Sequence, residues 1–290
     1  MPSRRGLIVM IHAFSTRRAG AVVLAATLVS AAPAAAVNLF SVQQDVQVGR
    51  QAAADADRQL PMVRDNAVTG YVNAIVQRLA AEATGPRFTY QVKVVDAADI
   101  NAFALPGGYV YVNRGLISAA RNESELAGVL AHEIAHVVER HGTENATKAY
   151  GAQAGVGLLA QLLAGRNHRV GLPQQIIGSL GLNAAFMKFS RDAENEADRV
   201  GAQMMSRAGY DPMAMASFFD LLESKQRSNP SAVSQFFSSH PAPANRSANI
   251  RRYASQLDGG NGRRVGDLGA VQARLDRMPQ PRRQAALRRS

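Results

Sequence analysis

The chain has 290 residues and contains no cysteine and no tryptophan. The absence of cysteine excludes disulfides, a thiolate zinc site, a cysteine nucleophile and a lipid-anchored cysteine. If the N-terminal segment directs export, as argued next, the absence of disulfides suits the bacterial periplasm. The sequence also lacks any nucleic-acid-binding motif, so we do not expect nucleic acid among its partners.

Long hydrophobic runs are scarce as well. Four arginines in the first 18 residues precede the uncharged run AGAVVLAATLVSAAPAAA, whose apolar part is short for a membrane span. The run ends in Ala34-Ala35-Ala36, which fits an A-x-A cleavage site. We therefore expect residues 1–36 to be a signal peptide, with a retained membrane anchor as the alternative. The predicted location is the periplasm, with association with the membrane left open.

The net charge of +11 is unevenly distributed. The leader contributes four arginines and no acid, residues 37–250 hold 19 basic and 19 acidic side chains, and residues 251–290 hold ten arginines and three aspartates. We predict a folded domain over 37–257 and an Arg-rich flexible tail over 258–290. Such a tail would touch anionic lipid or another polyanion without specific recognition.

Hydrophobic periodicity predicts a mainly helical α+β domain with a small β-sheet. A stretch without acids, 149–186, is interpreted as two packed helices, with a mobile lid as the alternative. The short runs on either side of Pro106-Gly107-Gly108 predict a hairpin or a bent strand. The predicted helices are 42–60, 67–81, 123–141, 190–207, 212–225 and one after the SSHPAPANR loop; the predicted strands are 88–97, 102–105 and 109–113.

The helix predicted over 123–141 carries two histidines and a glutamate in the segment AHEIAH, although its other residues are mostly apolar or small. Imidazole and carboxylate groups are costly to bury without a partner. His132 and His136 are four residues apart, so both face one side of the helix and can bind one metal ion. Glu133 can reach a metal-bound water without being a ligand. This HExxH arrangement predicts one zinc ion per chain.

A third protein ligand is needed if zinc is to keep one position open for water. The extended motif HExxHxxGxxH is excluded, because Glu139 and Gly142 stand where its glycine and third histidine would be. A downstream helix containing ENEAD offers a carboxylate instead. We assign Glu194 as the ligand and Asp198, on the same face, to orienting an imidazole N–H. The alternative is that these acids only solvate a helix surface.

Four segments follow one another along the chain: NAFALPGG at 101–108, HEIAH at 132–136, ENEADRVG at 194–201 and SSHPAPANR at 238–246. Together they resemble metallopeptidase family 48, which includes CAAX prenyl proteases, HtpX-type membrane proteases and periplasmic proteases of outer-membrane quality control. The resemblance runs from about residue 42 to residue 250. It implies a gluzincin zinc endopeptidase with His132, His136 and Glu194 as ligands and Glu133 as the catalytic base. Unlike some members of the family, this sequence is expected to form neither their transmembrane helices nor a helical repeat domain.

In the expected mechanism Glu133 takes a proton from water activated by zinc and returns it to the leaving amine. His240 and Arg246 are the candidates for stabilising the oxyanion, because the family has a His-Pro followed by an arginine near the zinc. His240 has two alternatives: it blocks the fourth zinc position, or it only caps a turn. His141 is interpreted as structural or solvated.

A protease that accepts many sequences must bind the backbone of its substrate. We therefore expect substrate to pair as an extended strand with the segment Asn101, Ala102, Phe103, Ala104 and Leu105. The predicted substrates are unfolded or misassembled envelope proteins, with peripheral contact to the membrane or the outer-membrane assembly machinery. Two alternative functions remain: an envelope chaperone or assembly factor with a latent or structural zinc site, and a non-enzymatic protein that binds lipid or cell wall.

Overall fold

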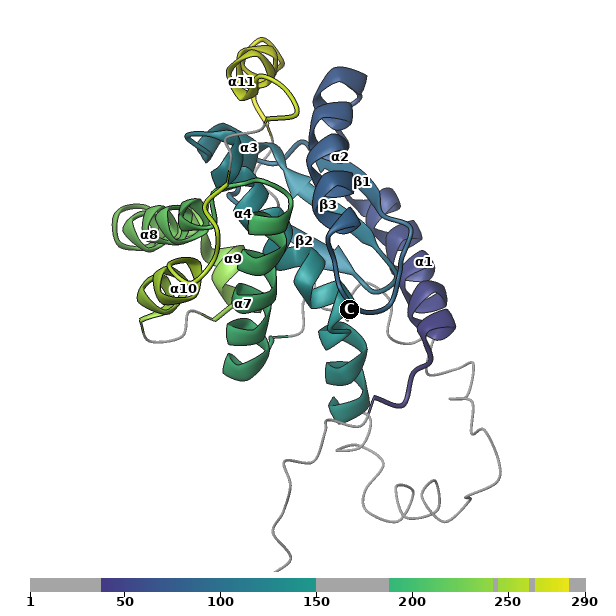
Figure 1. Cartoon of the computed structure of the whole chain (residues 1–290). Coiled ribbons are helices and arrows are strands. Elements are labelled where there is room, and N and C mark those ends of the chain that lie inside the picture. The colour runs from purple at the N-terminus through teal and green to yellow at the C-terminus, as the bar shows by residue number, and fades with distance from the viewer. Residues whose placement is uncertain (1–37, 150–187, 242–244, 261–263, 282–290) are drawn as a thin grey trace, which may run out of the picture. The chain divides into compact units, whose positions relative to one another are not determined.

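The computed structural model describes residues 38–149, 188–241, 245–260 and 264–281 (Figure 1). The predicted signal peptide and nearly all of the acid-free stretch 149–186 lie outside the described residues. The helices are α1 (Val42–Gln59), α2 (Asn66–Ala81), α3 (Arg114–Ala119), α4 (Glu123–Val138), α7 (Arg191–Arg207), α8 (Met213–Ser228), α9 (Ser234–Ser239), α10 (Arg246–Ala254) and α11 (Leu268–Asp276). The strands are β1 (Gln91–Val95), β2 (Ala102–Leu105) and β3 (Tyr109–Asn113). This content confirms the predicted, mainly helical α+β class.

Three strands form one sheet in the order β1–β3–β2 within the described residues, with β1 parallel and β2 antiparallel to β3. The predicted hairpin is therefore confirmed, and its register pairs Ala102 with Val112. Gly107 in the hairpin turn has φ 79°, and a Cβ there would lie 2.6 Å from the Cα of Val46 on α1. Only glycine fits this turn, which fixes where β2 ends.

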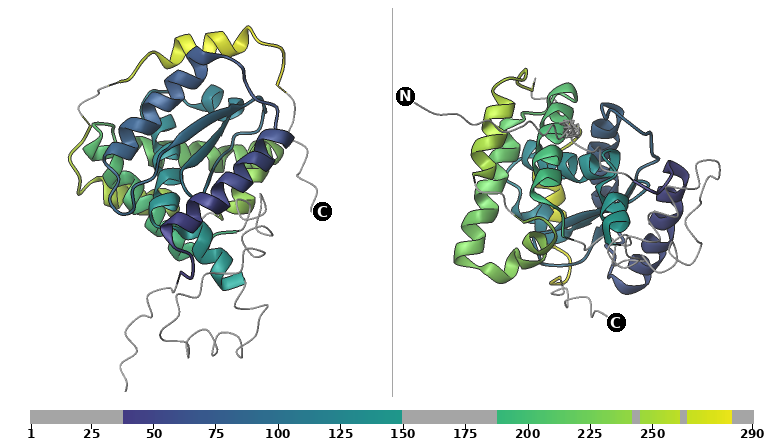
Figure 2. Two further views of the ribbon diagram at one scale, coloured as in Figure 1. Left: turned by 90° about the vertical axis from the view of Figure 1, so that its right-hand side faces the viewer. Right: turned by 90° about the horizontal axis from the view of Figure 1, so that it is seen from below.

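The two faces of the sheet are covered by different helices (Figure 2). On one face, Phe103 and Tyr111 pack against alanines of α1, and their rings are stacked at 4.9 Å. On the other face, Val110 and Val112 join the larger core formed with α2, α4, α7 and α8. This division follows from the two-residue period of a strand.

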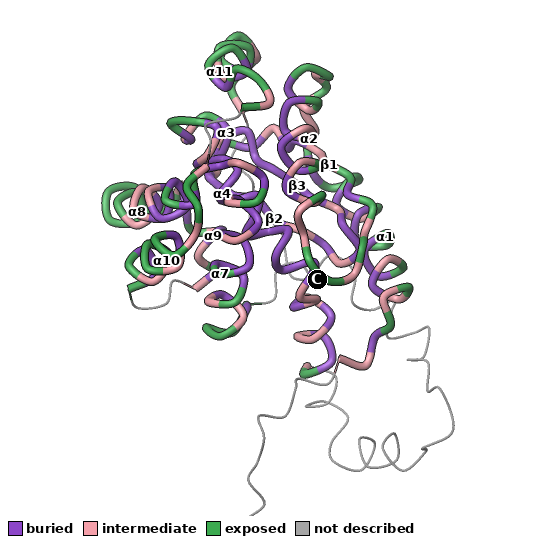
Figure 3. The backbone as a smooth tube through the Cα atoms, viewed as in Figure 1, coloured by how far each residue is buried: buried purple, intermediate pink, exposed green. Residues whose placement is uncertain are grey.

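Helix α4 lies at the centre of the larger core, and nearly every residue from Glu123 to Val138 is buried (Figure 3). Asn122 caps its first turn by accepting a hydrogen bond from the N–H of Glu125. The expected end at His141 with Gly142 beyond it is wrong. The helix stops at Val138, Arg140 takes a left-handed conformation (φ 60°), and helical conformation resumes over 141–149. Arg140 is held there by Asp45 of α1, whose Oδ2 lies 2.6 Å from Arg140 Nε.

Helix α7 crosses α4 closely at Gly201, where a Cβ would lie 3.2 Å from the carbonyl carbon of Ala131. Ser190 caps α7 by accepting a hydrogen bond from the N–H of Ala193. The close crossing brings the first two turns of α7 beside the histidines of α4. The sequence thus specifies both the start of α7 and its approach to α4.

The region 258–290 was expected to be a flexible tail, and this expectation is wrong for its described part. Helix α11 buries Leu268, Val271 and Leu275 in the larger core. Its spacing of three and four residues gives one apolar face despite the many arginines nearby. None of the helices within the described ranges is long and apolar enough to cross a membrane.

Candidate metal centre

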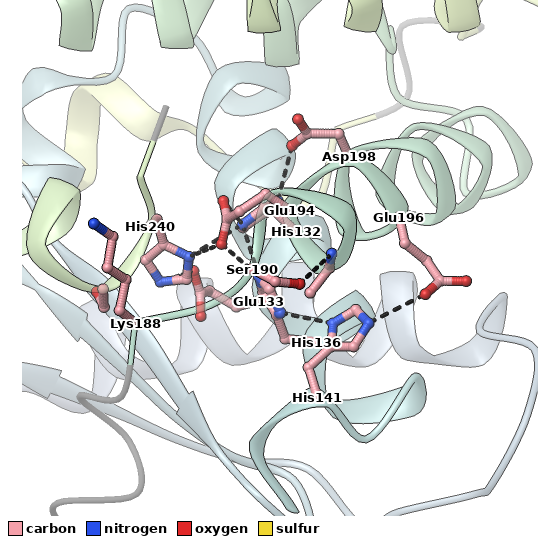
Figure 4. A network of polar contacts seen from close by, with 12 residues as sticks. His132, Glu133, His136, His141, Lys188, Ser190, Glu194, Glu196, Asp198 and His240 are labelled. Atoms are coloured by element: carbon pink, nitrogen blue, oxygen red, sulfur yellow. Dashed lines mark hydrogen bonds and ion pairs between the residues drawn. The ribbon is translucent and has the colours of Figure 1, made fainter. Parts of the chain in front are cut away.

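Two imidazoles of α4 form the base of a buried polar cluster (Figure 4). His132 is 0% exposed and His136 is 4% exposed. Their Nε2 atoms lie 3.0 Å apart, as their spacing of four residues on one helix face predicts. Two nitrogens at this distance inside a core are well placed to share one cation.

Glu194 of α7 completes the cluster that the sequence predicted. Its Oε2 lies 3.5 Å from His132 Nε2, and its Oε1 lies 3.4 Å from His136 Nε2. Burial raises the pKa of Glu194, but contacts with His240 and the two helix histidines outweigh it and hold the pKa well below its usual range. Burial lowers the pKa of His136 well below its usual value, which favours the neutral imidazole that a metal ligand requires.

His240 also belongs to this cluster. Its Nδ1 lies 3.0 Å from Glu194 Oε1 and 3.3 Å from His132 Nε2. One ligand atom from each of His132, His136, Glu194 and His240 lies within 4.8 Å of all the others. The loop histidine is therefore close enough to act as a fourth ligand.

The donor set fits a zinc ion. Zinc prefers imidazole nitrogens and carboxylate oxygens in a tetrahedral arrangement. Within the described part of the chain, Glu133 Oε1 is buried and accepts no hydrogen bond, whereas Glu194 Oε2 is buried with Arg246 Nη1 3.0 Å away. A buried carboxylate oxygen without a donor is costly, and a metal-bound water beside Glu133 would remove that cost.

Glu133 lies next to the cluster and contacts strand β2. Burial raises the pKa of its carboxyl group. Its Oε2 accepts a hydrogen bond from the backbone N–H of Ala104 at 3.1 Å, and its Oε1 lies 3.5 Å from His240 Nε2. This placement connects the candidate base to the strand expected to bind substrate.

Strand β2 is at the edge of the described sheet, beside Glu133. Asn101 O accepts a hydrogen bond from Asn113 N. In the antiparallel register, the backbone N–H and C=O groups of Asn101, Phe103 and Leu105 therefore point toward β3. The backbone groups of Ala102 and Ala104 consequently point away from β3, and Ala104 N–H points to Glu133. A narrow crevice lined by Ala104, His136 and Phe189 lies at the same place.

Asp198 lies one turn beyond Glu194 and contacts the other nitrogen of His132, with His132 Nδ1 and Asp198 Oδ1 3.0 Å apart. Arg246 of α10 donates to both oxygens of Asp198 at 3.0 and 2.7 Å. It also lies 3.0 Å from Glu194 Oε2 and packs over the Phe219 ring at 3.7 Å. An oxyanion donor must face the substrate, whereas this 1% exposed guanidinium is engaged by two carboxylates.

Two further side chains belong to the polar network: His141, which was expected to be structural or solvated, and Glu196, for which no role was predicted. His141 is 3% exposed, and its Nδ1 lies 2.8 Å from Nδ1 of His136. Its Nε2 lies 3.2 Å from Glu196 Oε2 (Figure 4). The sequence signal was present, since a histidine five residues after His136 follows the HExxH motif directly. It was not recognised because the helix was expected to continue through this position.

Comparison with known proteins identifies a metallopeptidase family and relatives that are named as proteases. Residues 66–254 match the peptidase family M48. The beta-barrel assembly-enhancing protease of Escherichia coli is 32% identical over 223 residues, which cover 75% of this chain and 45% of that protein. The mitochondrial metalloendopeptidase OMA1 of Schizosaccharomyces pombe is 32% identical over 199 residues, covering 68% of this chain and 56% of that protein. The chain spans about half the length of the curated relatives it matches.

Proposed function

Because this chain belongs to peptidase family M48, we propose that it is a zinc endopeptidase of the bacterial envelope that cleaves misfolded or unassembled proteins. The family match confirms the resemblance predicted from the sequence, and with it the metallopeptidase class. The observation that carries the proposal is the buried convergence of His132, His136 and Glu194, with Glu133 beside them. Glu133 Oε1, which is buried and accepts no hydrogen bond, supports a metal with its bound water in the site.

In the proposed mechanism, His132, His136 and Glu194 would hold a zinc ion, which would supply Lewis acidity and lower the pKa of a bound water to near neutral. Glu133 accepts the proton of that water on Oε1, the oxygen that has no hydrogen-bond donor. The raised pKa of Glu133 suits it to hold this proton and pass it to the leaving amine. Before substrate binds, the Ala104 N–H holds the other oxygen of the same carboxylate.

Arg246 is assigned to a different role from the one expected. Its contacts with Asp198 and Glu194 fix the positions of these two carboxylates of α7 and offset their negative charge. Asp198 in turn fixes the proton of His132 on Nδ1, which leaves Nε2 for the metal. His240 is the remaining candidate for oxyanion stabilisation, a role that its ring would fill only after moving off the ligand atoms.

The proposed location and substrates rest on the leader and on the relatives. The Arg-rich leader and its A-x-A end favour export to the periplasm. The Escherichia coli relative is named for enhancing β-barrel assembly, which favours unassembled outer-membrane proteins as substrates here. The arginines beyond residue 250 favour peripheral contact with an anionic membrane surface or with the assembly machinery.

A second candidate function is an envelope chaperone or assembly factor whose metal site stays closed. The position of His240, 3.0 Å from a Glu194 oxygen and within the ligand cluster, favours it. A chaperone would suppress the aggregation of an unfolded protein without cleaving it.

The deciding experiment measures zinc content and casein cleavage of the full chain beside Glu133→Gln. We expect both proteins to hold one zinc and to unfold alike, while the variant loses at least about 100-fold in turnover, the lower range for a lost general base. Equal cleavage by the two proteins would exclude Glu133 as the base. Bound zinc without cleavage by the unmodified chain would instead favour the chaperone.

A further inference from the structure

A chain of three side chains leads from the metal-facing cluster to the protein surface (Figure 4). His136 directs Nε2 to the cluster and Nδ1 to His141, with the two Nδ1 atoms 2.8 Å apart. His141 Nε2 continues to Glu196 Oε2 at 3.2 Å. His141 is buried, whereas the Glu196 side chain is 44% exposed.

Metal binding by His136 would determine where the protons lie along the series His136, His141 and Glu196. If His136 Nε2 offers its lone pair to a metal, its proton must be on Nδ1. That N–H can only donate to His141 if Nδ1 of His141 carries a lone pair. His141 must then have its own proton on Nε2, where the Glu196 carboxylate accepts it. Every donor is thus matched with an acceptor.

His132, the other histidine of α4, contacts a carboxylate directly, without an intervening imidazole. His132 Nδ1 lies 3.0 Å from Asp198 Oδ1. Asp198 shares a helix face with Glu194, while Glu196 lies about 200° around α7 from Glu194 at about 100° per residue. A carboxylate on that side is too far from His136 for direct contact, so an intervening imidazole spans the gap.

The break after α4 is what makes this contact possible. In a continuous helix, position 141 would lie about 140° around the axis from position 136, facing away from Nδ1. Arg140 in its left-handed conformation turns the chain and returns His141 to the ring of His136. The pair between Arg140 and Asp45 holds this turn in place.

We infer that His141 and Glu196 are positioning residues that fix the tautomer and ring orientation of His136 for metal binding. This inference rests on the proposed zinc site. Phe189 stacks on a face of the His136 ring, with the ring centroids 4.0 Å apart. His136 is therefore held both by packing on its face and by a directed hydrogen bond at its edge. Hydrogen bonds behind a metal ligand commonly contribute 10- to 100-fold to metal affinity.

The test is the zinc dissociation constant of the full chain, measured by competition with a chromogenic chelator. His141→Phe keeps the ring volume but removes the acceptor, and we expect about 10- to 100-fold weaker zinc binding. His141→Asn places an amide oxygen where Nδ1 stood and should restore most of the affinity. Glu196→Gln should weaken binding more than Asp192→Asn, a control that removes an exposed acid from the same helix without touching His141.

The outcomes separate this inference from the proposed function. Equal zinc affinity in the unmodified chain and His141→Phe overturns the inference alone, as does an equal loss in the Phe and Asn variants, which would indicate packing only. Failure of the unmodified chain to bind zinc overturns the proposed function instead. Thermal unfolding of the metal-free proteins verifies that each variant is folded.

Discussion

His240 illustrates how one residue can serve two opposed roles. Its Nδ1 lies among the ligand atoms, and its Nε2 is 3.5 Å from the candidate base Glu133. Although burial lowers the pKa of His240, the carboxylates of Glu133 and Glu194 outweigh it and raise the pKa. The ring is thus held on the site by the groups that catalysis needs.

If that position blocks the metal, His240→Ala raises basal proteolysis of an unfolded substrate at unchanged zinc content. A blocking ligand must leave before water and substrate can bind, so its removal takes away an unfavourable step. If His240 instead stabilises the oxyanion, the same substitution costs about 100-fold or more in turnover. Comparing the initial rates of casein cleavage by the unmodified chain and by His240→Ala decides between these outcomes. We expect the variant to cleave faster. Equal rates would leave His240 with neither role.

Asp198 supports a second prediction at the scale of single residues. Asp198→Ala removes the acceptor of the His132 N–H and should weaken zinc binding by about 10- to 100-fold. His136→Ala removes a ligand and should cost more. Zinc titration against a competing chelator ranks the two variants. An Asp198→Ala protein with unchanged affinity would return this acid to a purely structural role with Arg246.

At the scale of elements, local signals determined α4 and α7 and left their ends uncertain. Asn122 and Ser190 cap the two helices, and apolar periodicity defines their faces, so HExxH and Glu194 could be placed on facing helices from sequence alone. The end of α4 depends on Asp45, 95 residues before Arg140, and no local pattern contains that contact. The role of His141 was missed for the same reason.

The edge of β2 carries the element-scale prediction. A peptide hydroxamate should pair its backbone with the outward groups of Ala102 and Ala104, taking the Ala104 N–H from Glu133. N-methylation of the pairing amide should weaken such an inhibitor about tenfold, the equivalent of about 1.4 kcal/mol for one hydrogen bond. A crystal structure of the complex checks the register. Inhibitor backbone paired with any other segment contradicts the prediction.

At the scale of the whole molecule, composition was a poor guide to the C-terminal region. Ten arginines among the last 40 residues indicated a solvated tail, and that average concealed three apolar residues on one face of α11. Two buried polar groups on the core hold this segment. Arg114 donates to Pro279 O at 2.7 Å and to Leu275 O, while Glu123 accepts from Val265 N at 2.7 Å. These contacts span more than 140 residues and cannot be read from a local window.

The C-terminal segment should therefore contribute to stability as part of the domain. Leu275 is fully buried between α11 and the core, so Leu275→Ala should lower the free energy of unfolding by about 2–5 kcal/mol through lost burial and a cavity. Met213→Ala, at a side chain that is 39% exposed, is the matched control and should change it by less than about 0.5 kcal/mol. Urea unfolding of the metal-free chain measures both. A Leu275 variant as stable as the control would mean that α11 is dispensable to the fold, whereas the expected loss would show that a region rich in arginine is held by the same core that positions α4.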